Sequence, residues 1–142
     1  MRGKAANAQR SAQAEEIGAV SSSEPLVCEK TFAAFCRSLF PKDVHDAVLL
    51  HLVEGDMRLL RIAGARARKD CAAAAQEANH LARMAGTLGL FQAAALARQL
   101  EETCLAGGQG STYGLIGRLS DVFQNSGNAL EALLQRGTKL DC

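Results

Sequence analysis

Apolar residues recur every three or four positions through most of the chain, and they seldom alternate one by one with polar residues. This spacing is typical of helices that bury one face. It predicts one short helix at about 29–39 and four long ones, at about 43–69, 70–89, 91–105 and 112–136. Asp70 is expected at the N-cap or in the first turn of the second long helix. The pattern therefore predicts an all-α fold, an antiparallel four-helix bundle with one short accessory helix.

The residues expected to face the core lie on one stripe of each long helix. On the first two helices the stripe comprises Val48, Leu52, Gly55, Leu59 and Ile62, then Ala74, Ala78, Leu81, Ala85 and Leu88. On the last two it comprises Ala93, Leu96, Leu100 and Cys104, then Leu115, Leu119, Val122, Ser126, Ala129 and Leu133. Gly55 lies within its stripe, where we expect the helix to bend.

The first 24 residues are small and polar without a sustained apolar period. We expect them to be a disordered tail preceding one domain at 25–142. Three basic residues near the start also suit an organellar transit peptide, but the glutamates at 15 and 16 count against it.

Composition narrows the function classes. The 142 residues suffice for one domain, and an aromatic content of 4% disfavours a β-sandwich or barrel. A net charge of +1 gives no overall basic field for nucleic acid, although the segment 58–69 is locally basic. No apolar run is long enough to cross a membrane. The five cysteines are odd in number and scattered, which favours reduced thiols in a cytoplasmic protein over disulfides or a zinc site. We expect no metal and no cofactor.

Ten residues between positions 62 and 101 match a known pattern in register: Ile62, Ala65, Asp70, Ala78, Leu81, Ala85, Gly86, Gly89, Leu100 and Glu101. In this segment the chain resembles the histidine-containing phosphotransfer (HPt) family of two-component phosphorelays. The resemblance implies a helical bundle that accepts a phosphoryl group on a histidine. It also implies receiver domains of response regulators and histidine kinases as partners, with no turnover of its own.

The phosphoacceptor position of this pattern is occupied by Asn79 rather than histidine. An amide cannot serve as the nucleophile, because its nitrogen lone pair is delocalised, whereas a neutral imidazole can. His80 is the next residue, and Arg83 lies one turn after it, where a cation would stabilise phosphoryl charge. In a register that takes His80 as the acceptor, Met84 replaces the glycine of the pattern.

Helical geometry places these side chains relative to the predicted core stripe. Asn79 and Arg83 are expected to point outward, at roughly 150° and 170° from the core direction, and His80 lies on the flank at roughly 110°. The expected outward face forms a partner-binding surface of mainly small residues around the candidate acceptor: Ala72, Ala75, Gln76, Asn79 and Gly86.

Three hypotheses remain open. The first is a phosphorelay module with His80 as a displaced phosphoacceptor assisted by Arg83. The second is an HPt-like adaptor that docks the same partners without carrying phosphate. The third, from another class, is a general helical interaction or chaperone-like protein, for which an apolar groove would be the discriminating feature. We expect a monomer in each case.

Overall fold

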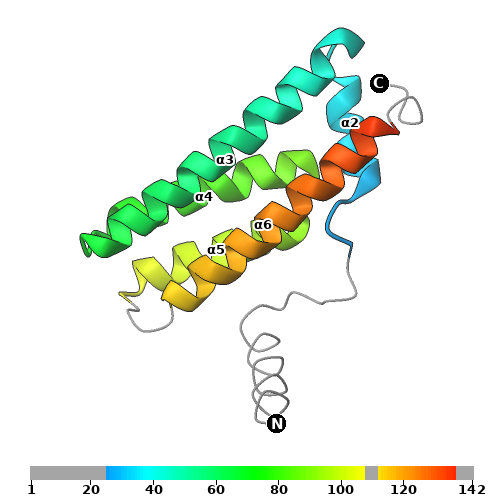
Figure 1. The fold of residues 1–142 in the computed structure, drawn as a ribbon. Helices are drawn as coiled ribbons and strands as arrows, with labels where there is room; N and C mark the ends of the chain where they lie inside the picture. Colours follow the sequence, from blue (N-terminus) through cyan, green and yellow to red (C-terminus); the bar gives the residue numbers. More distant parts are fainter. Residues whose placement is uncertain (1–24, 108–111, 137–142) are drawn as a thin grey trace.

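The computed structural model describes residues 25–107 and 112–136, which are almost entirely helical and contain no strand (Figure 1). The elements are α2 (Glu29–Arg37), a 3-10 turn η1 (Pro41–Asp43), α3 (Val44–Ala67), α4 (Cys71–Leu88), α5 (Phe91–Leu105) and α6 (Thr112–Gln135). The predicted all-α class is confirmed, and the helix bounds lie within about two residues of those predicted. The predicted tail lies outside the described residues.

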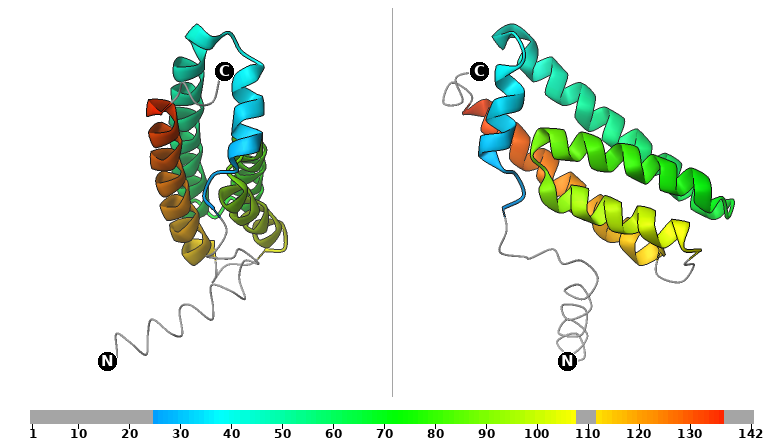
Figure 2. Two further views of the ribbon diagram at one scale, coloured as in Figure 1. Left: turned by 90° about the vertical axis from the view of Figure 1, so that its right-hand side faces the viewer. Right: turned by 180° about the vertical axis from the view of Figure 1, so that it is seen from behind.

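The four long helices lie side by side (Figures 1 and 2). Helix α4 packs most extensively on α5 and then on α3, while α6 packs on α5 and on α3. The shorter α2 packs against α4, at the end where α4 turns into α5 (Figure 2). Five helices are thus packed against one another around a common apolar interior.

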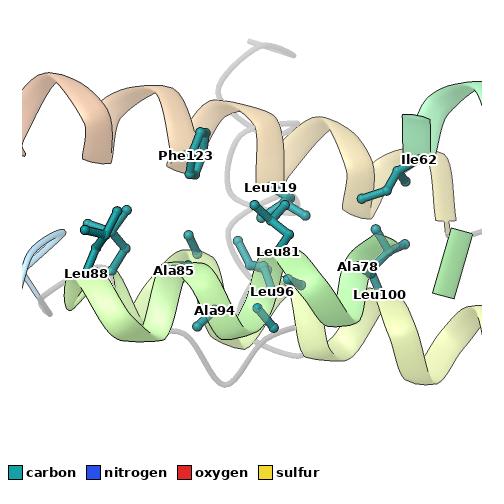
Figure 3. Packing of buried hydrophobic residues seen from close by; sticks show 14 of the residues in the cluster. Ile62, Ala78, Leu81, Ala85, Leu88, Ala94, Leu96, Leu100, Leu119 and Phe123 are labelled. Atoms are coloured by element: carbon teal, nitrogen blue, oxygen red, sulfur yellow. The ribbon is translucent and has the colours of Figure 1, made fainter. Parts of the chain in front are cut away.

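That interior consists of leucines from α4, α5 and α6 with many alanines between them. Figure 3 shows Leu119 and Phe123 of α6 pointing toward the alanine- and leucine-lined faces of α4 and α5. The predicted stripes of α4 and α5 are buried throughout. On α6, Phe123 is buried where Val122 was expected, and Val122 is only partly buried. Phe123 is the larger side chain, so it determines which edge of α6 faces the core.

Gly55 makes room for this phenylalanine. A methyl group built on Gly55 would overlap the Phe123 ring and would lie 2.9 Å from Met84 Cε. Helix α3 continues without a break through Gly55. The glycine therefore allows three helices to approach one another, whereas the sequence indicated only a bend.

Both ends of α4 are fixed by local chemistry. At the start, Asp70 Oδ1 accepts a hydrogen bond from Ala73 N (3.0 Å), which confirms the predicted N-cap. At the end, Gly89 adopts a left-handed conformation with φ of 84°, and Leu90 N donates to Ala85 O (2.8 Å). Gly89 O also accepts from Cys28 N (2.8 Å), which ties the segment before α2 to this turn.

We expect Gly55→Ala to destabilise the protein by about 1–3 kcal/mol, because the new methyl group forces Phe123 out of its site. Gly117→Ala on α6 is the matched control, since a methyl group there meets nothing within 4 Å. It should stabilise the helix by about 0.5–1 kcal/mol. Urea denaturation of the three proteins measures both effects, and equal stabilities of the two variants would contradict the packing role of Gly55.

We expect Gly89→Ala to cost more stability than Gly107→Ala. Both glycines have positive φ, which costs an alanine about 1–2 kcal/mol, but a methyl group on Gly107 meets nothing within 4 Å. On Gly89 it would lie 2.8 Å from Cys28 O. The difference between the two variants, about 1 kcal/mol in thermal or urea unfolding, reports the contact with the α2 segment. Equal losses would show that the contact contributes nothing.

Candidate functional site

The exposed face of α4 differs from the predicted one at Ala75. Ala72, Gln76 and Arg83 are exposed and Gly86 is partly exposed, as expected for an outward face. Ala75 is only 3% exposed, so the expectation that it forms part of a partner-binding surface is wrong. It lies one turn before Asn79, on the flank of α4 that packs on α5.

Burial of Ala75 and of Ala82 changes the orientation of the whole helix. When both are counted with the predicted stripe, the buried direction of α4 lies about 35° from the predicted one, toward the Asn79 flank. His80 then lies at about 145° from the core direction and Asn79 at about 115°, which reverses the predicted order. The imidazole is therefore the more outward of the two side chains.

Asn79 is held by α5. Its Nδ2 donates to both carboxylate oxygens of Glu101, to Oε2 at 3.2 Å and Oε1 at 3.4 Å. Glu101 is itself half-buried. The residue at the acceptor position of the resembled pattern thus joins α4 to α5 through its amide.

His80 is half-buried and has no hydrogen-bond or ion-pair partner among the described residues. Arg83 is exposed one turn further along, and its side chain is likewise unpaired within residues 25–107 and 112–136. Positions three apart on a helix are neighbours, so the guanidinium can reach an anion held on the imidazole. Together they offer a nucleophilic nitrogen and a cation on one accessible helix face.

Gly86 lies on the edge of this face and differs from the two structural glycines. A methyl group on Gly86 would have Arg98 Nη2 as its nearest neighbour, at 3.9 Å, which is ordinary van der Waals contact. Nothing in the described fold therefore requires glycine at this position. The neighbouring atom is the end of the flexible Arg98 side chain.

An ion-pair network joins α3 to α4 beside His80. Arg58 Nη1 bonds Glu77 Oε1 at 2.7 Å, and Arg58 Nη2 bonds Glu54 Oε2 at 3.0 Å. These contacts, the one with Glu77 foremost, raise the pKa of the Arg58 guanidinium. Arg58 is thus occupied within the fold, although from the sequence it belongs to a locally basic segment, 58–69.

Arg66 departs further from that expectation. It is buried, its Nε donates to Thr112 Oγ1 at 2.6 Å, and its guanidinium lies 4.7 Å from the centre of the Tyr113 ring. These contacts join the end of α3 to the start of α6. The predicted basic flank of 58–69 is therefore reduced to its exposed members, Arg61, Arg68 and Lys69.

Outside α4, His51 has a structural role, and the described cysteines form no metal-binding cluster. His51 Nδ1 lies 2.8 Å from Ala47 O, and the ring packs edge-on against Phe35 at 5.3 Å, which joins α3 to α2. Cys28, Cys71 and Cys104 are free thiols. Across the described ranges, no three His, Cys, Asp or Glu side chains gather as a metal site would require. None of the described helices has the length and apolar content to span a membrane.

Four apolar residues on the outer side of α3 were not singled out from the sequence. Leu50, Val53, Met57 and Leu60 are exposed, at spacings of three, four and three. The signal was present in the sequence as a second helical stripe, on the side of α3 opposite to Val48 and Ile62.

No family model matches the chain, and no curated protein or solved structure is significantly similar to it.

We expect the Asn79–Glu101 pair to contribute about 1 kcal/mol of coupling energy, as a partly buried hydrogen bond to a carboxylate does. A double-mutant cycle of Asn79→Ala, Glu101→Ala and the combined variant, followed by urea denaturation, measures it. Gln76→Ala, an exposed residue one turn earlier, is the control and should change stability by less than about 0.5 kcal/mol. Strictly additive effects of the two substitutions would contradict the link between α4 and α5.

Proposed function

We propose that the protein is an HPt-like module of two-component signalling that docks receiver or histidine kinase domains and carries a phosphoryl group on His80. In this proposal α3 to α6 form the antiparallel four-helix bundle of that family, and α2 is the accessory helix. The pairing of α4 with α3 and α5, and of α6 with the same two helices, supports the arrangement. The resemblance within residues 62–101 supports the family.

The observation that carries the proposal is the position of His80. Ideal helical geometry places its imidazole at about 145° from the core direction, against about 115° for Asn79. His80 is half-buried, as Asn79 is, and has no hydrogen-bond or ion-pair partner among the described residues. An acceptor must present a ring nitrogen to an aspartyl phosphate on another protein. Asn79 does not meet that need, because its amide is engaged by Glu101 and is not nucleophilic.

The chemistry requires one bond to form and one to break. The lone pair of a neutral His80 ring nitrogen attacks the phosphorus of the receiver's aspartyl phosphate in line with the leaving oxygen. The P–N bond forms, the P–O bond to aspartate breaks, and the aspartate leaves as carboxylate. The other ring nitrogen keeps its proton, and Arg83 offsets the charge on the phosphoryl oxygens.

A receiver would meet α4 along its exposed residues. Gln76, one turn before His80, offers a neutral hydrogen-bonding side chain, and Gly86 adds no side chain at the far edge. Because Ala72 is exposed and small, the partner's backbone can approach α4 closely at its start. These contacts are suited to docking whether or not phosphate is transferred.

Two alternatives have observations in their favour. The Asn79–Glu101 bond favours an HPt-like adaptor, since the acceptor position of the family then serves only to join helices. The exposed apolar stripe on α3 favours a general helical interaction protein. Both alternatives predict binding without phosphorylation.

We expect the protein to acquire acid-labile, base-stable label when incubated with autophosphorylated histidine kinases and phosphorylated receivers. His80→Ala should abolish the label, because it removes the nucleophile. Asn79→Ala should retain it, and Arg83→Ala should slow the transfer by about tenfold through loss of one charge-assisted hydrogen bond. Time courses with radiolabelled phosphate measure all four proteins.

The same experiment separates the alternatives. Label that survives in His80→Ala would contradict His80 as the acceptor. Absence of label across a full panel, with binding to one receiver or kinase in calorimetry, would replace the relay with the adaptor. If the protein acquires no label and binds no receiver or kinase, the general helical interaction protein is the remaining hypothesis.

A further inference from the structure

The outer side of α3 carries an apolar stripe that no described element covers. The exposed fractions are 69% for Leu50, 55% for Val53, 46% for Met57 and 73% for Leu60. All four lie on the side of α3 opposite to Val48 and Ile62, which are buried. The stripe exposes roughly 400 Å², which is within the range of the largest apolar patch on a typical monomer, a patch that is often functional.

Two adjoining hollows follow this stripe. One, of about 380 Å³, is lined by Asp46, Leu49, Leu50 and Val53. The other, of about 490 Å³, is lined by Leu50, Val53, Glu54 and Met57, with His51, Arg58 and Arg61 at its edge. In each hollow, the first four residues named are spaced i, i+3, i+4 and i+7 along α3. Four residues with this spacing form the hole that receives one side chain of a facing helix. The stripe is thus shaped to pair with another helix.

Charge is segregated along α3. The exposed charged residues within α3 change sign along the helix: Asp46, Glu54 and Asp56, then Arg61, with Arg68 and Lys69 directly after its end. A facing helix with the reverse order of charge is complementary to this one. An antiparallel copy of α3 has that order, whereas a parallel copy would place like charges together.

We propose that α3 pairs with α3 of a second copy of this chain, antiparallel, with the two-fold axis level with Gly55. In this register the partner's Leu60 is level with Leu50 and enters the first hollow. The partner's Met57 is level with Val53 and enters the second. A single two-fold axis therefore places a side chain of the partner in each of the two hollows of both copies.

The same register pairs opposite charges. The partner's Arg61 lies three residues, or about 4.5 Å along the helix, from the level of Asp46, which an arginine side chain spans. Both residues are exposed, so this pair sets orientation more than it adds affinity. The 24 residues of α3 extend about 36 Å, enough for flanking side chains to add to the stripe.

The area indicates a reversible dimer. A stable interface buries roughly 800 Å² on each partner, and the stripe supplies about half of that. This departs from the monomer expected from the sequence. Gln76, His80 and Arg83 all lie on α4, so the dimer does not depend on the proposed phosphotransfer function.

We expect sedimentation equilibrium of the full chain to give a mass that rises with concentration from one copy to two. Leu60→Glu should raise the dissociation constant by about tenfold or more, because it places a charge in an apolar hollow. Leu105→Glu is the matched control, since Leu105 is 67% exposed on α5, away from the stripe, and should leave dimerisation unchanged. Circular dichroism confirms that both variants fold.

A charge reversal tests the orientation. Asp46→Arg and Arg61→Asp should each weaken the dimer, and the double variant should restore it, because every cross-partner pair is then reversed. A double variant no better than the single ones would overturn the antiparallel register. Wild-type protein that stays monomeric at about millimolar concentration, or that instead binds vesicles of anionic phospholipid through the stripe, would overturn the dimer itself.

Discussion

The close approach of an alanine-rich α4 to its neighbours is the constraint on which the rest of the structure depends. Seven residues of α4 are buried and five of them are alanine: Ala74, Ala75, Ala78, Ala82 and Ala85. Small side chains let α4 pack on α5 and on α3 at the same time, because their backbones can come close. The position of Phe123 against Gly55 and the glycine turn at Gly89 follow from the same closeness. The burial of both flanks also decides which residues of α4 remain outward, and hence that the imidazole is among them.

Much of the fold follows from local chemistry and was predictable. The helix bounds, the cap at Asp70 and the buried stripes of α4 and α5 depend on periodicity and on residues within one turn of each other. The rest depends on partners distant in sequence. The contact of Gly55 with Phe123 and the bond of Arg66 to Thr112 join α3 to α6, and no local pattern marks either. Alanine is nearly neutral as a periodic signal, so the burial of Ala75 and Ala82 could not be distinguished from exposure.

The candidate site, like the fold, was predictable in part from local sequence and in part depends on residues distant in sequence. The residues His80 and Arg83 were identified from the sequence because their types and spacing carry the chemistry. Their orientation was misjudged by about 35°, since the helix was assumed to bury one face and it buries two. The engagement of Asn79 by Glu101 depends on how α5 lies against α4. Helix α3 has two apolar stripes. The one that includes Gly55 faces α6, because the absence of a side chain on Gly55 leaves room for the Phe123 ring.

The ion-pair network of α3 links the two proposed surfaces in electrostatic terms. Glu77 lies one turn before His80, close enough for its carboxylate to repel a phosphoryl group on the imidazole. Arg58 binds Glu77 at 2.7 Å and so offsets that charge, and its other nitrogen is held by Glu54. Glu54 is also a wall of the hollow that receives the partner's Met57. The Arg58 guanidinium therefore lies between Glu54, on the side of α3 that carries the proposed pairing surface, and Glu77, on the helix that carries the proposed phosphoacceptor.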